Sequence, residues 1–349
     1  MFSLRPKIVA VLGGLIATAT LVGGCSDQAA EPAEVNVYSY RQEILIRPLL
    51  DAFTAETGII VNVVSGKADA LLERLKNEGI NSPADLLLAA DVGRLLRAQA
   101  ADVLQPMVSD VVTDIVPANF RDPDGYWVGL SMRARTIFYA KDRVDPATLS
   151  TYAALTSEEW KGEICIRNAS NVYNQSMLAA LIDRNGAEVA EAWAAGIVAN
   201  MARRPQGGDR DQLRAVAADE CDLAIANSYY YGRMMAEEPG HADREVAEAV
   251  GLFWADQDGA GTHVNISGAA LTKYSKNKEA AIKLVEFLLS EEAQRIYAET
   301  VFEYPIRKGV PLSPIVAAWG DFVADDRNLS AIGKHSTEAV MIMDRVGWE

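Results

Sequence analysis

Histidine and cysteine are scarce, since the 349 residues contain only 3 of each. The histidines His241, His263 and His335 stand far apart without metal-ligand spacing, so a zinc site is not expected. They also leave few groups for acid–base catalysis, although Asp and Glu are plentiful. The nucleophile elbow G-x-S-x-G, the HExxH motif and the P-loop are missing as well. These absences argue against an enzyme.

Basic residues are outnumbered, with 33 Lys and Arg against 48 Asp and Glu and a formal charge of −15. A surface of this sign repels nucleic acid and anionic membranes, but it does not repel cations. No apolar run beyond the N-terminal segment is long enough to span a membrane. The chain therefore reads as a soluble α/β protein of one large or two medium domains behind its N-terminal segment.

The N-terminal segment has the pattern of an export signal. Arg5 and Lys7 precede the apolar stretch "IVAVLGGLIATATLVGGC", which ends in small residues. "LVGGC" resembles the lipobox of bacterial lipoproteins, in which the cysteine is acylated and becomes the first mature residue. We expect a signal peptide over 1–24, lipidation of Cys25 and a polar tether over 25–34. Plain secretion and a single membrane anchor are the alternatives.

Two cysteines remain in the body of the chain, Cys165 and Cys221. In an oxidising compartment an even pair is expected to form a disulfide. The long loop that this bond closes would stabilise the fold by about 3–5 kcal/mol in the chain-entropy model. A zinc site or a catalytic thiol would need partner residues, and none has a suitable spacing.

Hydrophobic periodicity predicts alternating strands and helices, which is typical of an α/β fold with a parallel sheet. The pattern restarts after the extended segment 126–144, so we expect two lobes with a ligand cleft between them. Lobe 1 is predicted over 35–132 and 256–305, and lobe 2 over 133–255, with 306–349 packing back. The predicted strands are 34–40, 59–66, 84–90, 162–170, 221–227, 250–256 and 262–272, and the predicted helices are 44–58, 68–79, 92–101, 174–186, 187–201, 212–220 and 277–300.

Three tyrosines stand side by side in "NSYYYG", after the predicted strand "CDLAIAN". Neighbouring side chains on a helix fan out by about 100°, so the three cannot all enter one core. Asn227 or Ser228 is a helix-cap candidate, which puts Tyr229 and Tyr230 in the first turn of a helix. We expect Tyr231 to pack elsewhere.

Phenolate is a hard oxygen donor suited to a small, highly charged cation. A trivalent ion would favour the deprotonated form, and a helix N-terminus adds a smaller push in the same direction. The residues alone leave other interpretations open, namely ordinary aromatic packing, hydrogen bonding at a lobe interface and a sugar-stacking platform.

Several motifs together resemble the ferric-ion-binding proteins of bacterial iron ABC importers, which are periplasmic two-lobed solute-binding proteins. The resemblance implies that each lobe is a mixed sheet flanked by helices. The resemblance covers nearly the whole mature chain. It rests on "VYSYRQ" with "FTAETGI", on "GLSMRART", on "NASNVYNQS" and on "ANSYYYGR". It implies a monomer that holds iron(III) through tyrosine oxygens in the interlobe cleft and delivers it to an inner-membrane permease.

The resemblance implies that Tyr173, Tyr229 and Tyr230 are the iron ligands. The first-lobe motif departs from the family pattern, because many relatives read Ser-Arg-His-Tyr where this chain reads Tyr40-Arg41-Gln42-Glu43. Gln42 stands at the histidine position and Glu43 at the tyrosine position. Glu43 can replace a phenolate with a carboxylate, or water or a small anion can fill that face. The alternative for Glu43 is a solvated residue at a helix start.

Arginines stand in or beside these motifs. Any one of them can pair with a synergistic anion or balance the phenolates, and ordinary surface ion pairing is the alternative for each. Tyr38, Tyr40 and Tyr126 are expected to pack. The arginines concerned are Arg41, Arg133, Arg135 and Arg233.

A binding protein of the same fold for another solute is the second hypothesis. An oxyanion site would favour hydroxyls and backbone donors at helix ends. A polyamine or thiamine-like solute would favour aromatics with carboxylates, which Tyr229, Tyr230 and Glu43 can supply. A visible charge-transfer band with iron(III) separates these possibilities from the first.

Overall fold

The computed structural model describes residues 33–349, so the predicted signal peptide, Cys25 and most of the tether lie outside the described residues. Within 33–349 no helix is both long and apolar enough to cross a membrane.

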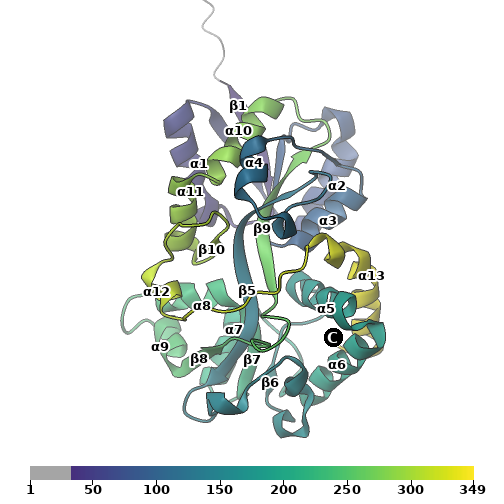
Figure 1. Cartoon of the computed structure of the whole chain (residues 1–349), viewed down its shortest axis with the longest axis vertical. Helices are drawn as coiled ribbons and strands as arrows, with labels where there is room; N and C mark the ends of the chain where they lie inside the picture. Colours follow the sequence, from purple (N-terminus) through teal and green to yellow (C-terminus); the bar gives the residue numbers. More distant parts are fainter. Residues whose placement is uncertain (1–32) are drawn as a thin grey trace, which may run out of the picture. The chain divides into compact units, whose positions relative to one another are not determined.

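The strands form two sheets that share β5, and this strand passes through the middle of Figure 1. The first half of β5 pairs with β9 from Val128 to Ala134, and its second half pairs with β7 and β8 from Arg135 onward. The strands are β1 Glu34–Ser39, β2 Ile60–Ser65, β3 Leu86–Ala89, β4 Leu104–Gln105, β5 Val128–Ala140, β6 Ile164–Cys165, β7 Leu223–Asn227, β8 Val250–Phe253, β9 Val264–Thr272 and β10 Tyr304–Pro305.

The strand order is β2-β1-β3-β9-β5-β7-β6, with β4 beside β9 and both β8 and β10 beside β5. β1 runs parallel to β2 and β3, whereas β9 runs antiparallel to β3 and β5. The sheet is therefore mixed, although the predicted α/β class is confirmed. β3, β7 and β9 are buried along their whole length, which explains their nearly continuous apolar sequences.

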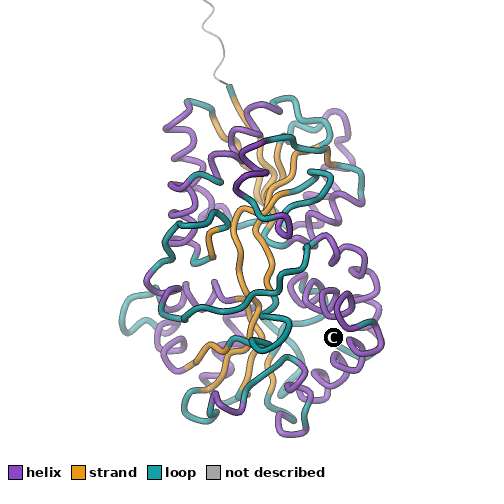
Figure 2. Tube along the Cα trace, viewed as in Figure 1, coloured by secondary structure: helices purple, strands orange, loops and turns teal. Residues whose placement is uncertain are grey.

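Helices cover both sheets, and Figure 2 shows them flanking the strands on either side. Gly58 ends α1 with a left-handed φ of 71°, a conformation that glycine adopts without strain. The helices are α1 Glu43–Thr57, α2 Ala68–Glu78, α3 Val92–Ala100, α4 Asp110–Ile115, α5 Val172–Asn185, α6 Ala187–Asn200, α7 Asp209–Ala217, α8 Ser228–Met235, α9 Ala242–Ala249, α10 Lys278–Leu288, α11 Glu291–Ile296, α12 Pro314–Ala317 and α13 Ser330–Arg345.

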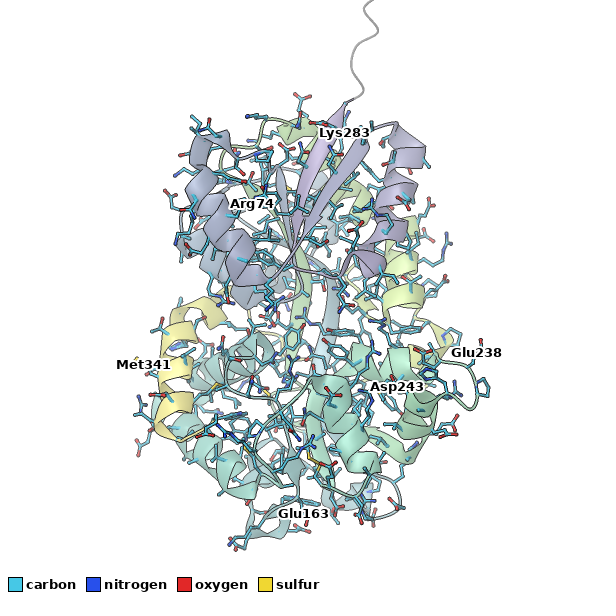
Figure 3. The ribbon with its side chains drawn as sticks, turned by 180° about the vertical axis from the view of Figure 1, so that it is seen from behind. Arg74, Glu163, Glu238, Asp243, Lys283 and Met341 are labelled. Carbon is cyan, nitrogen blue, oxygen red and sulfur yellow. A yellow bond between two sulfur atoms is a disulfide. The ribbon has the colours of Figure 1, made fainter. Side chains whose placement is uncertain are left out.

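The C-terminal helix α13 packs against α5, α6 and α3, so it contacts elements from both halves of the sequence. Figure 3, seen from behind, labels Met341 on the outer side of α13, and this side chain is 55% exposed. The same view places Lys283 of α10 and Glu163 near opposite ends of the described body. The lobe boundaries at 132/133 and 255/256 stay predictions.

Several predicted elements are wrong in extent. α7 spans Asp209–Ala217 instead of 212–220, and β8 ends at Phe253 instead of 256. The helix predicted over 277–300 is broken, because the Ser290 hydroxyl caps a new helix by accepting a hydrogen bond from the Ala293 amide at 3.2 Å. The strand predicted over 162–170 is reduced to β6, because Asn171 caps α5 instead. For the same reason α5 begins at Val172 and includes Tyr173, ahead of the predicted start at 174.

The predicted disulfide is present between Cys165 and Cys221. It joins the end of β6 to the turn before β7, and these two strands lie side by side in parallel register. The bond therefore fastens together the two strands whose carboxyl ends lead toward α5 and α8.

Candidate metal centre

The tyrosine triplet begins where a fully buried strand ends. β7 stops at Asn227 and α8 starts at Ser228, so Tyr229 and Tyr230 lie in the first turn of the helix. Their rings stack with centroids 4.1 Å apart and planes 30° apart. Two neighbouring phenols thus point in one direction, as the change from strand to helix allows.

Tyr231 turns away from this pair, as predicted. Its hydroxyl donates to the Val250 carbonyl oxygen at 3.1 Å, and its ring packs against Phe138 and Trp319. The side chain is buried in a hydrophobic cluster on the other side of α8. It contributes to packing.

The third phenol comes from the start of α5. The Asn171 side chain accepts hydrogen bonds from the backbone amides of Tyr173 and Asn174, which fixes the first turn of this helix. The Tyr173 hydroxyl lies 3.3 Å from the Tyr229 hydroxyl. The structure therefore brings Tyr173, Tyr229 and Tyr230 together at the N-termini of two helices.

Burial controls the protonation of these phenols. It is the main cause that raises the pKa of Tyr229 well above the ordinary value, and repulsion from Tyr173 and Tyr230 adds to it. The pKa of Tyr230 is also raised, first by burial and then by Tyr173. Without a bound cation these two phenols are therefore protonated at neutral pH. A nearby metal ion reverses this preference, because it favours the anionic ligand.

Guanidinium groups surround the phenols. The guanidinium carbons of Arg133, Arg135 and Arg167 lie 5.6, 5.9 and 5.8 Å from the centre of the Tyr173 ring. Arg41 lies 5.9 Å from the centre of the Tyr229 ring. Positive charge at this distance favours a phenolate over a phenol.

Three buried carboxylates hold these arginines in place. Arg41 pairs with Glu303 at 2.8 Å, Arg133 with Asp91 at 3.2 Å and Arg135 with Asp209 at 3.1 Å. Asp209 is also 3.7 Å from Arg167. Arg135 further donates to the side-chain oxygens of Asn227 at 3.1 Å and Asn174 at 2.5 Å.

The cluster has surplus positive charge and unused donors. Arg233, one turn after Tyr229 on α8, forms no ion pair within 33–349, and burial lowers its pKa. Five guanidinium groups therefore face three carboxylates. In the described part of the chain the buried Nε atoms of Arg41, Arg133, Arg135 and Arg167 also have no hydrogen-bond partner. An anionic ligand would satisfy both the charge and the donors.

The two remaining predicted ligands, Gln42 and Glu43, lie at the start of α1. Gln42 is exposed at the start of α1 and gives it no side-chain cap. Glu43 forms an ion pair with Arg47, one turn further along α1, and its side chain is 46% exposed. Within residues 33–349 no hydrogen bond or ion pair joins either of them to Tyr173, Tyr229 or Tyr230. Their role as ligands stays a prediction.

Sequence reasoning missed Arg167, Asp209, Asp91 and Glu303. Arg167 stands close to the "NASNVYNQS" motif and could have been found there. Glu303 is 262 positions from Arg41, and its one local sign is a carboxylate within an otherwise aromatic and apolar stretch, "VFEYP". The described residues contain no cluster of three or more His, Cys, Asp or Glu with metal-binding geometry, so tyrosine oxygens are the metal-ligand candidates that the geometry brings together.

A family model described as bacterial extracellular solute-binding protein matches residues 49–324. This match covers most of the chain, so the chain belongs to that family.

Individual relatives narrow the class further. The chain is 47% identical to iron uptake protein A1 of Synechocystis sp. over 325 residues, which are 93% of this chain and 90% of that protein. It is 30% identical to the major ferric iron-binding protein of Neisseria meningitidis serogroup B over 289 residues, 81% of this chain and 84% of that one. These relatives confirm the resemblance that the motifs indicated.

A comparison with solved structures identifies the same class of protein from the fold. FutA (IdiA) from Trichodesmium, in complex with iron and citrate ligands, matches with a TM-score of 0.87 and 47% identity. The match covers 91% of this chain and 100% of that chain. The predicted two-lobed α/β fold of periplasmic binding proteins is thereby confirmed.

Proposed function

We propose that this protein binds ferric iron outside the cytoplasm through the oxygens of Tyr173, Tyr229 and Tyr230 and delivers it to an ABC permease of the inner membrane. The observation that carries the proposal is the 3.3 Å separation of the Tyr173 and Tyr229 hydroxyls, with the Tyr230 ring stacked on Tyr229. Three phenolates balance the charge of a trivalent ion, so the ion itself adds no net charge to the buried site.

A synergistic anion completes the site in this proposal. The surplus of two positive charges among the guanidinium groups suits a carboxylate-bearing or oxyanion ligand beside the metal. We expect the anion to accept hydrogen bonds from Arg233, which has no ion pair within 33–349, and from the Nε atom of Arg41, which has no hydrogen-bond partner there. Arg135 is held by Asp209, Asn227 and Asn174 and serves mainly to balance the phenolates. The relative with bound iron and citrate supports this arrangement.

The visible spectrum tests the proposal directly. The purified protein mixed with ferric citrate should turn orange-red, because phenolate transfers charge to iron(III). Tyr230→Phe should weaken or shift the band. Tyr231→Phe is the matched control, since the adjacent residue loses only its hydrogen bond to the Val250 carbonyl and should keep the colour. A colourless wild-type protein that still binds citrate alone would favour an oxyanion-binding protein, which the arginines also suit.

The same proposal includes solute binding without turnover. The buried carboxylates beside the tyrosines form ion pairs with arginines. The surplus of arginines also disfavours binding of a polyamine or a thiamine-like cation. Incubation with common ester and phosphate substrates should give no product above the buffer background.

We also propose that the protein is a periplasmic monomer tethered through lipidated Cys25. The family of extracellular solute-binding proteins supports export, and the "LVGGC" pattern supports the lipid anchor. Mass spectrometry of the membrane fraction should detect acylated Cys25 after cleavage of 1–24, and Cys25→Ala should release the protein into the soluble periplasmic fraction.

A further inference from the structure

A cavity of about 170 Å³ lies between the C-terminal half of α5, the N-terminal half of α6 and the loop that leads into β9. Figure 1 shows α5 and α6 side by side close to α13. At about 30 Å³ per water in the liquid, the cavity has room for a ligand with the bulk of roughly five or six waters. None of the proposed iron ligands lines it.

The cavity has an apolar wall and a carboxylate that forms no ion pair within residues 33–349. Ala180, Leu181 and Trp193 supply the apolar side, and Asp256 supplies the carboxylate. Asp256 forms no ion pair in the part of the chain described by the structure, and burial raises its pKa. A partly desolvated carboxylate without a cation gains strongly when a positively charged group binds to it.

His263 adds a second acceptor to the same wall. Its side chain lines the cavity although the residue is only 6% exposed, and neither ring nitrogen has a hydrogen-bond partner among residues 33–349. Burial lowers its pKa to about 3, so the ring is neutral and offers one nitrogen as an acceptor. An imidazole that faces a cavity without a protein partner can accept a hydrogen bond from a ligand bound there.

The other charged groups around the cavity already hold one another. Asp325 accepts from Arg184 at 2.7 Å and from Arg327 at 2.8 Å, which leaves Asp256 as the carboxylate available to a ligand. The walls are also fixed. The Tyr152 hydroxyl donates to the Arg135 carbonyl oxygen at 2.5 Å and accepts from the His263 amide at 3.2 Å, and thereby ties the cavity to β5.

We propose that this cavity binds a small molecule with a primary ammonium group and a short apolar chain. The ammonium donates to Asp256 and to the free ring nitrogen of His263, and the chain lies along Leu181 and Trp193. A simple alkylamine and a small apolar amino acid share this chemistry. The amino acid's carboxylate has an additional partner in the guanidinium of Arg184, whose ion pair with Asp325 uses one of its nitrogens.

The test is a titration of the purified, iron-free protein with n-butylamine and, separately, with L-valine, followed by calorimetry and by amide chemical shifts. At least one of the two should bind and shift the amides of Gly261 and His263, whereas butyrate and butanol should not. Valine binding more tightly than butylamine would identify the amino acid as the better ligand class. The reverse order would identify the plain amine.

Substitutions locate the site. Asp256→Asn should weaken binding about tenfold or more, which corresponds to the loss of a charge-assisted hydrogen bond. Asparagine also tolerates the left-handed backbone of this position, where φ is 58°. Asp258→Asn is the matched control, because this residue is exposed two positions along the same loop and should leave the affinity unchanged.

A second variant leaves the charge intact. Ala260→Leu adds bulk to the cavity wall and should also abolish binding, and thermal unfolding reports whether the variant is folded. The proposal is overturned if neither ligand binds at tens of millimolar, or if Asp256→Asn and Asp258→Asn lose affinity equally. Since the titration contains no iron, its failure leaves the proposed ferric site untouched.

Discussion

The two sides of the tyrosine cluster are built differently. The side formed by α5, β7 and α8 supplies all three phenols, each in the first turn of a helix that starts from a buried strand or a side-chain cap. The side formed by β1 and α1 supplies Arg41, which is buried, and Gln42 and Glu43, which are exposed. One side thus presents the three proposed iron ligands at capped helix starts, and the other presents a buried charge next to a solvated helix start.

This difference suits two roles, metal binding on the tyrosine side and charge compensation on the Arg41 side. Donor atoms that must approach a single ion need shared, well-fixed positions, and the helix starts provide them. Charge compensation acts over a longer range, so Arg41 can serve from the other side at 5.9 Å from the Tyr229 ring.

Lowering the pH should produce the largest effect, a loss of iron affinity at the three tyrosines. Because burial raises the pKa of both Tyr229 and Tyr230, both are protonated in the ion-free protein at neutral and acid pH, and iron must displace both protons. Apparent affinity should therefore fall by at least about a hundredfold for each unit of decreasing pH. Competition with a chelator of known pH dependence measures this slope. A slope below one proton per ion would mean that the phenols are not the ligands.

Glu303→Gln should remove the buried ion pair that fixes Arg41. The side chains of Glu303 and Arg41 are 0% and 5% exposed, and removing one charge leaves the other buried without a partner. We expect a loss of about 3–5 kcal/mol in the free energy of unfolding, measured by urea titration. The control is Glu43→Gln, which breaks an exposed pair with Arg47 and should cost about 0–1 kcal/mol. Similar losses in both variants would contradict the difference in burial.

Tyr173→Phe tests whether the Tyr173 oxygen binds the ion. The change removes one oxygen while the ring stays among Arg133, Arg135 and Arg167. Iron affinity should fall by about a hundredfold or more, because the loss of a direct ligand costs at least as much as the loss of an outer partner of a ligand. The intensity of the visible band should fall as well. An unchanged band with unchanged affinity would show that Tyr173 packs beside the site without binding the ion.

Glu43→Gln should have the smallest effect on iron. The carboxylate is about half exposed and paired with Arg47, so the change should reduce iron affinity by less than about fivefold. Equilibrium competition with citrate is sensitive enough to measure it. A loss of tenfold or more would assign Glu43 to the metal and make the two sides equal partners.

Much of the fold was predictable because the local signals agree with one another. Gly58 and Gly79 end α1 and α2 where the helical periodicity ends, and the apolar run at 84–90 contains the buried strand β3. The break between α10 and α11 was missed because the apolar periodicity continues across Ser290, and the cap is visible only from its hydrogen bond.

The site was predictable in part. The tyrosines carry a chemical signal in their own residue type. The motif "NSYYYG" also placed Tyr229 and Tyr230 at a helix start, whereas Tyr173 fell just before the predicted helix 174–186. The partners of the arginines carry none, because Glu303 meets Arg41 and Asp91 meets Arg133 through the order of strands in the sheet. The strand–helix alternation alone indicates a parallel sheet, whereas the family resemblance implied a mixed sheet in each lobe. The antiparallel pairing of β9 with β3 and β5 confirms the mixed sheet.

The continuity of β5 has a mechanical consequence. This strand leaves one sheet after Ala134 and enters the other at Arg135, and Arg135 pairs in register with Asn227, the residue before the tyrosine helix. Any swivel of one sheet against the other must twist the backbone at this point. The guanidinium beside Tyr173 and the helix start that carries Tyr229 therefore both lie at the point where the two sheets meet, and a rotation of one sheet against the other would move them together.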